Sequence, residues 1–247
     1  MKILLIIPAY NEENCITKVI DELVERYPQY DYIIVNDGST DHTSEICHKS
    51  GYEIIDLPIN LGLAGAFQTG LKYAYLKNYD YAMQMDADGQ HLPEYIEALI
   101  KKINEGYDIV IGSRFVTEKK PKSMRMLGSN MISWAIHMTT GVRVMDPTSG
   151  MRIFNRNMIK EFASNINYGP EPDTISFLLK QGAKIGEVQV KMAERIAGES
   201  YLNFTKSIWY MTKMLISIIV LQNFRKRKYE VEIINSEETS YEKSSIN

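Results

Sequence analysis

Two aspartates separated by one residue, Asp86 and Asp88, follow a short apolar run that is typical of a buried strand. At such a strand end their side chains can point to one side of a turn, where two carboxylates repel each other. A divalent cation removes this repulsion and can bind the diphosphate of a nucleotide at the same time. Gln90 offers a neutral oxygen to the same ion. Because an isolated Asp-x-Asp is more often an acidic turn or a helix start, the metal prediction depends on the other strand ends.

Polar residues follow three further apolar runs, in the stretches PAYNEE at 8–13, VNDGSTD at 35–41 and GSRF at 112–115. Loops lie on the surface, so core packing does not explain these polar groups. In the second stretch an Asp-Gly pair favours a turn, and Thr40 or Asp41 caps the helix that follows. Asp37 has no part in that local structure. We therefore expect its carboxylate to accept hydrogen bonds from a base or a ribose.

The elements that must position these residues alternate along the chain. Short apolar runs predict strands at 3–7, 32–35, 53–57, 81–85 and 109–111, and helices are expected at 13–26, 41–49, 62–77 and 93–105. The second half predicts a helix at 123–139, a strand at 151–154, a helix at 171–181 and a strand at 184–191. This alternation predicts an α/β fold with a mostly parallel central sheet flanked by helices. Ligands gather at the carboxyl ends of the strands in such sheets.

The composition is that of a globular protein: 247 residues, of which 45% are hydrophobic and 24% charged, with a net charge of −3. This charge argues against nucleic acid as a partner. Two cysteines without metal-type spacing, Cys15 and Cys47, favour a reduced cytosolic chain. The apolar run at the N-terminus is closed by Pro8 and has no cleavage site, so it predicts a first strand rather than a signal peptide.

The C-terminal part predicts an amphipathic helix. The fourteen positions 208–221 are almost continuously apolar, but at about 1.5 Å per residue they span only about 21 Å of an approximately 30 Å hydrocarbon core. We expect the helix to lie along a membrane interface, with the basic run 225–228 on anionic lipid, or to pack on the domain or another subunit. The predicted units are a catalytic domain at 1–200, this helix at 201–228 and an acidic, disordered tail at 229–247.

The set PAYNEE, VNDGSTD, MDADGQH and GSRF resembles the family 2 inverting glycosyltransferases of the GT-A, Rossmann-like fold. It is most similar to the branch of dolichyl-phosphate mannose synthase and polyprenyl-phosphate glycosyltransferases. Asn60-Leu61-Gly62 and the stretch DPTSGMR at 146–152 also resemble that branch. The similarity covers about residues 2–200.

The resemblance implies a role for each matching residue. The nucleoside would be surrounded by Pro8, Tyr10, Glu12, Val35 and Asp37, and the nucleotide sugar contacted by Asp86, Ala87 and Asp88. Mg²⁺ or Mn²⁺ would be held by Asp86, Asp88 and Gln90. Arg114 and Arg195 would face phosphate groups, and Arg125 the acceptor. Related synthases have a lysine six residues after the position of Arg195, where this chain has Tyr201.

The resemblance implies a single inverting displacement from a UDP- or GDP-sugar to polyprenyl phosphate, for cell-surface glycan synthesis, with catalysis by Asp86, Asp88 and Arg114. Transfer to a sugar hydroxyl of a growing polysaccharide is the alternative, with Glu171 or Asp173 as the catalytic base. Their ordinary role would be charge at a loop and helix start. A nucleotidyltransferase and a non-catalytic nucleotide-sugar-binding module are further alternatives. A lipid acceptor predicts a peripheral position on the inner face of the cell membrane, with a small membrane-protein partner or a homo-oligomer.

Overall fold

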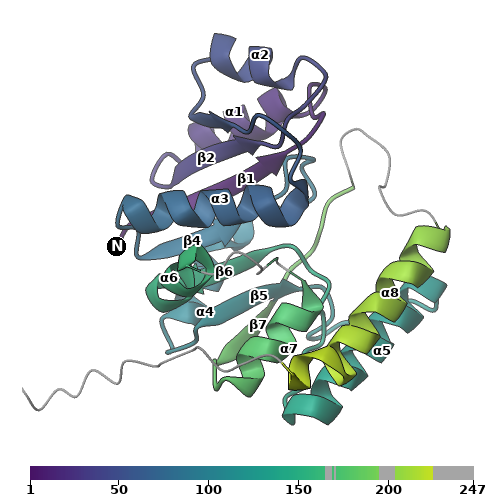
Figure 1. Ribbon diagram of the computed structural model, residues 1–247. Coiled ribbons are helices and arrows are strands. Elements are labelled where there is room, and N and C mark those ends of the chain that lie inside the picture. Colours follow the sequence, from purple (N-terminus) through teal and green to yellow (C-terminus); the bar gives the residue numbers. More distant parts are fainter. Residues whose placement is uncertain (165–168, 170, 195–203, 225–247) are drawn as a thin grey trace, which may run out of the picture.

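The computed structural model describes residues 1–164, 169, 171–194 and 204–224, and it contains a seven-stranded sheet between helices (Figure 1). The strand order is β3-β2-β1-β4-β6-β5-β7. The strands are β1 (Ile3–Ala9), β2 (Asp31–Asn36), β3 (Ile54–Asp56), β4 (Tyr81–Gln84), β5 (Ile109–Ser113), β6 (Arg152–Asn155) and β7 (Ile185–Gln189). Only the pairs that involve β6 are antiparallel. The predicted mostly parallel sheet is confirmed.

Helices cover both faces of the sheet. They are α1 (Ile16–Arg26), α2 (Thr43–Lys49), α3 (Gly62–Leu76), α4 (Ile96–Ile103), α5 (Met124–Thr140), α6 (Arg156–Ser164), α7 (Pro172–Lys180) and α8 (Phe204–Ile219), with short 3-10 turns η1 (Pro93–Tyr95) and η2 (Leu221–Asn223). Successive residues of β1 point to opposite faces. Leu5 and Ile7 pack with α1 and α4, whereas Leu4 and Ile6 pack with α3 and α6. Burial on both faces explains why β1 reads as a continuous apolar run.

Helix α6 was not predicted, because it follows β6 without a loop. Asn155, the last residue of β6, accepts a hydrogen bond at its side-chain oxygen from the backbone N of Met158 (2.9 Å) and so caps the helix. Arg156 donates to the backbone oxygens of Tyr75, in the last turn of α3, and of Tyr79, in the loop that follows it. This ties the new helix to its neighbour on the same face of the sheet.

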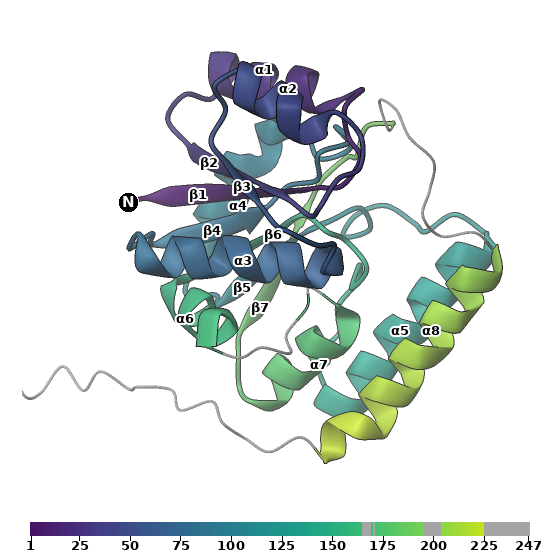
Figure 2. The same cartoon turned by 45° about the horizontal axis from the view of Figure 1, so that its top comes forward.

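The described part of the C-terminal segment packs on the domain. Helices α5 and α8 lie side by side at one end of the molecule, next to α7 (Figures 1 and 2). The contact is close at Gly128, where an added Cβ would lie 1.4 Å from the sulfur of Met211. No helix among the described residues is long and apolar enough to cross a bilayer. Residues 201–203, the basic run 225–228 and the predicted acidic tail lie outside the described residues.

Candidate functional site

The carboxyl ends of β1, β2 and β4 meet at one edge of the sheet and surround a cavity of about 210 Å³. The two neighbouring parallel pairs, β1 with β2 and β1 with β4, bring the three chain exits together. The cavity is lined by Pro8, Ala9, Tyr10, Glu12, Asp37, Leu63, Ala66, Asp86, Ala87 and Asp88. Most residues predicted to bind the nucleotide sugar therefore line this one cavity. Val35 does not line it, because its side chain is fully buried in the core.

Hydrogen bonds brace the two loops that form one side of the cavity. The side-chain oxygen of Asn11 accepts from the backbone N of Thr40 (2.8 Å), and Ser39 Oγ accepts from the backbone N of Asn11 (3.0 Å). Asn11 has a φ of 57°, a left-handed conformation that asparagine tolerates better than most residues. The loops after β1 and β2 thus hold each other in place.

The N-cap of α2 is His42, so neither Thr40 nor Asp41 is the predicted cap, but Asp41 still bonds to the first residue of the helix. Its Oδ1 accepts from the backbone N and hydroxyl of Thr43, and its Oδ2 from the backbone N of Glu13. Burial raises the pKa of Asp41, but these hydrogen bonds outweigh burial and bring it below its usual value. The same carboxylate therefore ties the first residue of α2 to the loop after β1.

Asp37 is buried, and the structure gives it a hydrogen-bond partner that the sequence did not reveal. Its Oδ1 accepts from the backbone N of Leu61 (2.7 Å), just before α3. Next to it Gly38 has a φ of +65°, and a Cβ there would lie 2.8 Å from the backbone of Asn60 and Ile59. The Asn60-Leu61-Gly62 stretch is thus the segment that packs against the Asp37 turn. Asp37 lines the cavity while one of its oxygens holds α3.

The two central aspartates differ in their surroundings. Asp88 is buried, and its Oδ1 accepts from the backbone N of Gln90 (3.0 Å). Asp86 keeps 35% of its side chain exposed, its Oδ2 lies 3.5 Å from Nε2 of His91, and its backbone N donates to Nδ1 of His91 (2.9 Å). Gly150 lies against both: an added Cβ would be 3.1 Å from His91 Cε1 and 3.4 Å from Asp86 Oδ2. Buried His91 thus orients Asp86.

Asp86 and Asp88 fit an Mg²⁺ or Mn²⁺ ion whose other ligands would be water and the phosphates of the substrate. Asp86 and Asp88 offer hard carboxylate oxygens to one cavity. Within the described part of the chain, no three His, Cys, Asp or Glu side chains form a group that could hold an ion by themselves. Mg²⁺ typically binds one or two carboxylates, with water and substrate phosphates completing its shell. Gln90 follows in the same turn; its backbone N and O are hydrogen-bonded to Asp88 and Ala193.

Arg114 follows β5 and forms a bidentate ion pair with buried Asp146. Its Nε lies 2.7 Å from Oδ2 and its Nη2 2.9 Å from Oδ1. Burial raises the pKa of Asp146, but the adjacent guanidinium outweighs burial, so this pKa lies below its usual value. Glu187 on β7 accepts from the backbone N of Met145 and of Asp146. Arg114, predicted to face phosphate, is thus held by a loop carboxylate and does not line the described cavity.

Arg152 on β6 is a functional candidate that sequence reasoning missed. It is 2% exposed and donates to the backbone oxygens of Pro147 and Ser149, each at 2.8 Å. Burial lowers its pKa, and nearby negative groups, including Glu171 and Asp86, oppose that shift. A single arginine inside the apolar run MRIF was the available signal, because a buried arginine needs partners.

Glu171 and Asp173 at the start of α7 contact the C-terminal helix. Asp173 Oδ2 accepts from Ser217 Oγ (2.7 Å) and lies 3.4 Å from Nε2 of Gln222. Glu171 accepts from the hydroxyl of Tyr210, whose pKa is raised by burial and by this carboxylate. The two candidate bases therefore link α7 to α8 and η2.

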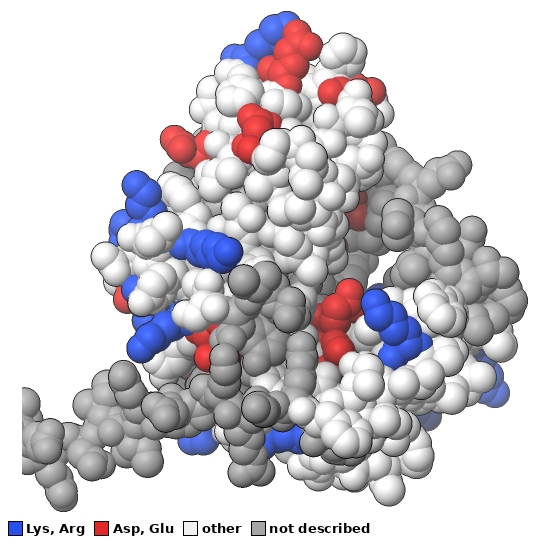
Figure 3. Space-filling view, viewed as in Figure 1, with Lys and Arg blue, Asp and Glu red and all other residues white. Residues whose placement is uncertain are grey.

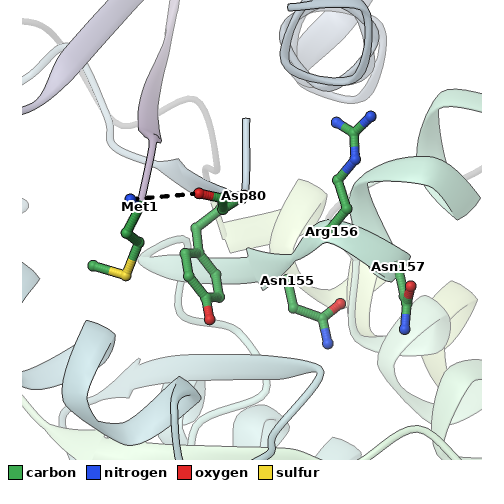
Figure 4. A pocket seen from close by; sticks show the side chains of 6 residues that line it. Met1, Asp80, Asn155, Arg156 and Asn157 are labelled. Carbon is green, nitrogen blue, oxygen red and sulfur yellow. Dashed lines mark ion pairs between the residues drawn. The ribbon is translucent and has the colours of Figure 1, made fainter. Parts of the chain in front are cut away.

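Two predicted arginines cannot be located relative to the cavity. Arg125 lies on α5, but its side chain is not among those described, and Arg195 lies outside the described residues. A different cavity, of about 390 Å³, lies at the amino ends of β1 and β4 (Figure 4). It is lined by Met1, Asp80, Tyr81, Asn155, Arg156 and Asn157. None of the predicted site residues lines it, so it does not compete with the strand-exit cavity.

Residues 4–163 match the model of glycosyl transferase family 2. The chain belongs to this family. It is 33% identical to a UDP-N-acetylglucosamine–dolichyl-phosphate N-acetylglucosaminyltransferase of Methanococcus voltae, over 76% of this chain and 84% of the relative. It is 30% identical to an undecaprenyl-phosphate mannosyltransferase of Micrococcus luteus, over 82% and 88%. The resemblance noted in the sequence is thus confirmed.

Solved structures of the same architecture confirm the fold. A mannosyl-3-phosphoglycerate synthase from Rubrobacter xylanophilus superimposes with a TM-score of 0.67 at 16% identity, covering 94% of this chain and 78% of that one. A glucosyl-3-phosphoglycerate synthase from Mycobacterium tuberculosis, in complex with Mn²⁺, UDP-glucose and phosphoglyceric acid, gives 0.65 at 19% identity, over 92% and 81%. At these identities the likeness shows the GT-A-like fold of this family 2 glycosyltransferase.

Proposed function

We propose that the chain transfers a hexose-type sugar from a UDP- or GDP-sugar to polyprenyl phosphate, for cell-surface glycan synthesis. The observation that carries this proposal is the single cavity at the exits of β1, β2 and β4, which combines Tyr10, Glu12 and Asp37 with Asp86 and Asp88. The names of the relatives from Methanococcus voltae and Micrococcus luteus support the acceptor.

In this proposal Pro8, Tyr10 and Glu12, with Asp37, bind the nucleoside. Asp86, Asp88 and Gln90 hold Mg²⁺ or Mn²⁺, and Asp86, Ala87 and Asp88 contact the nucleotide sugar. The ion, when bound, neutralises charge on the departing nucleoside diphosphate. Arg114, Arg125 and Arg195 are the proposed cationic side chains for the phosphate groups of donor and acceptor. An oxygen of the acceptor phosphate attacks the anomeric carbon as the bond to the diphosphate breaks, with inversion.

The contacts of Asp173 favour a phosphate acceptor over a sugar hydroxyl. A hydroxyl needs a base to take its proton, whereas a phosphate monoester is already anionic at neutral pH. Asp173 accepts hydrogen bonds from Ser217 and Gln222, and Glu171 accepts one from Tyr210. Both carboxylates therefore have a structural role between α7 and the C-terminal segment. Transfer to a sugar hydroxyl remains the alternative function, with Asp173 as its catalytic base.

A polyprenyl-phosphate acceptor lies in a membrane, so we propose a peripheral position on the cytoplasmic face. The chain would reach its acceptor through the membrane surface, alone, as a homo-oligomer or with a small membrane protein. In the described part of the chain no helix can cross a bilayer.

A donor panel with polyprenyl phosphate in detergent tests the proposal. We expect product with one UDP- or GDP-sugar, loss of product on chelation with EDTA, and recovery with Mg²⁺ or Mn²⁺. Asp86→Asn and Asp88→Asn should each lower kcat/KM at least about 100-fold, because each removes a carboxylate ligand of the ion that neutralises the leaving diphosphate. Asp80→Asn, an exposed acid at the other end of the sheet, is the matched control. Undiminished product after thorough chelation would contradict the metal role of the two aspartates.

A further inference from the structure

Helix α5 exposes an apolar stripe that nothing in the described domain covers. Its members recur every three or four residues, the spacing of one helix face: Met124, Leu127, Met131, Trp134 and Met138. Trp134 is 59% exposed. The opposite face of the helix carries Ile132 and Ile136 into the core. An amphipathic helix normally buries its single apolar face, whereas α5 has apolar side chains both on its buried face and on its exposed face.

Helix α8, which packs against α5, continues this apolar surface. Its exposed large side chains are Trp209, Ile216 and Ile219, and the exposed residues Val220, Leu221 and Phe224 follow it. Trp209 is 72% exposed, so both tryptophans of the chain lie on this helix pair and face solvent. We call the exposed apolar residues of α5 and α8 the α5–α8 face. Contiguous apolar surface of this kind marks a protein or membrane interaction site.

A basic cavity flanks the stripe of α5. It measures about 420 Å³, and its walls include Lys119, Lys120 and Arg143 together with Asn130 of α5, the residue before Met131. One acid, Glu118, also lines it. Lys120 is half-buried and donates to Ser129 Oγ (3.0 Å), which holds its ammonium beside the helix. The cavity thus offers several cations to an anion at the edge of an apolar surface.

The α8 part of the α5–α8 face has few charged neighbours. Figure 3 shows mostly uncharged surface over the lower part of α7 and α8. Lys213 is the exposed cation of α8 within the described residues, and in the sequence the run Arg225-Lys226-Arg227-Lys228 directly follows exposed Phe224. Among the described residues, cations therefore lie at the α5 edge of the apolar surface, and the sequence has a basic run after η2.

We propose that the α5–α8 face and the basic cavity of Lys119, Lys120 and Arg143 dock the enzyme on a bilayer that contains anionic lipid. Tryptophan is enriched at membrane interfaces, where its ring is apolar and its N–H meets the headgroups. The methionine and leucine side chains enter the acyl boundary, and the cations bind headgroup phosphates. A second copy of the chain would bring an equally basic edge to the contact, and like charges disfavour that pairing.

This inference rests on the proposed function only for the biological purpose of docking, which would be to bring the donor cavity to a lipid acceptor. Binding itself needs no acceptor. We expect the full-length chain to sediment with phosphatidylcholine vesicles that contain 30% phosphatidylglycerol, and much less with pure phosphatidylcholine. Each cation near the surface is worth about fivefold in affinity, so raising the salt should release the protein. Tryptophan fluorescence should shift to the blue on binding.

Two double variants test the two parts of the surface. Trp134→Ser with Trp209→Ser should reduce vesicle affinity about 100-fold in sedimentation, whereas Lys119→Gln with Arg143→Gln should cost about 25-fold, only with anionic lipid. Leu76→Ser and Lys101→Gln, exposed on α3 and α4, are the matched controls.

The outcomes separate this inference from the proposed function. Turnover of a short-chain polyprenyl phosphate in detergent should survive both double variants, and a loss of vesicle binding alone leaves the proposed function standing. Folded wild-type chain that ignores anionic vesicles overturns the docking surface. So does a dimer, measured by light scattering, that the tryptophan variants convert to monomer without changing vesicle binding.

Discussion

Replacing Gly150 by alanine tests the placement of Asp86 with a single methyl group. The added Cβ would lie 3.1 Å from His91 Cε1, inside the normal carbon contact distance of about 3.5–4.0 Å. It would also touch the two carboxylate oxygens of Asp86, at 3.4 and 3.5 Å. His91 must therefore give by a few tenths of an ångström. Its side chain is only 2% exposed and accepts from the backbone N of Asp86, so its displacement moves Asp86 with it.

Overpacking of a core position costs about 1–3 kcal/mol, and we expect the lower end because the required shift is only a few tenths of an ångström. About 1 kcal/mol lowers Tm by about 2–4 °C in a chain of this size. A misplacement of 1 Å costs about 100-fold in rate, so a shift of a few tenths should cost roughly 10-fold in kcat and weaken Mn²⁺ binding.

Thermal unfolding, Mn²⁺ titration by calorimetry in the presence of nucleoside diphosphate, and turnover measure these effects together. Ser149→Ala is the matched control, because it removes the buried hydrogen bond from Ser149 Oγ to the backbone oxygen of Gly112 without crowding Asp86. It should cost about 1 kcal/mol as well. If both variants lost the same stability and kept the same Mn²⁺ affinity and turnover, the assigned role of Asp86 would be refuted.

Three further predictions concern buried polar groups. Arg152→Met should lower the free energy of unfolding by about 3 kcal/mol in urea titrations, because it leaves carbonyl groups buried without donors; a loss below 0.5 kcal/mol would contradict this. Asp146 has a lowered pKa in the folded state, so its pairing with Arg114 stabilises the fold above the unfolded pKa of about 3.9 and is lost as the pH falls through the folded value; Asp146→Asn should flatten the acid side of the stability curve, and an unchanged slope would speak against the pair. Asp173→Asn and Ser217→Ala should both reduce turnover only severalfold with polyprenyl phosphate, because both loosen the same contact between α7 and α8; a large kcat loss in Asp173→Asn alone would instead support a catalytic base.

Elements and strand ends were predictable because their signals are local. The apolar run of β1 and the helical spacing of α1, α3 and α4 depend on neighbouring residues, and the structure contains each of them within a few positions. Parallel pairing then brings the ends of β1, β2 and β4 together, whatever the details of packing. Helix α6 was missed because its start is marked only by the cap from Asn155 and not by a loop.

By itself the sequence determined the order of strands and helices along the chain except for α6, the acids and polar groups at the strand ends, and membership in a family of glycosyltransferases. The tertiary structure alone decided the partners: Leu61 for Asp37, Asp146 for Arg114, and His91 beside Asp86. Most of these partners are distant along the chain, and only packing brings them within hydrogen-bond reach. Exposure was likewise undecided, because the apolar residues of α5 have the same helical spacing whether they face the core or the solvent. The fold buries one side of that helix and leaves Trp134 outside.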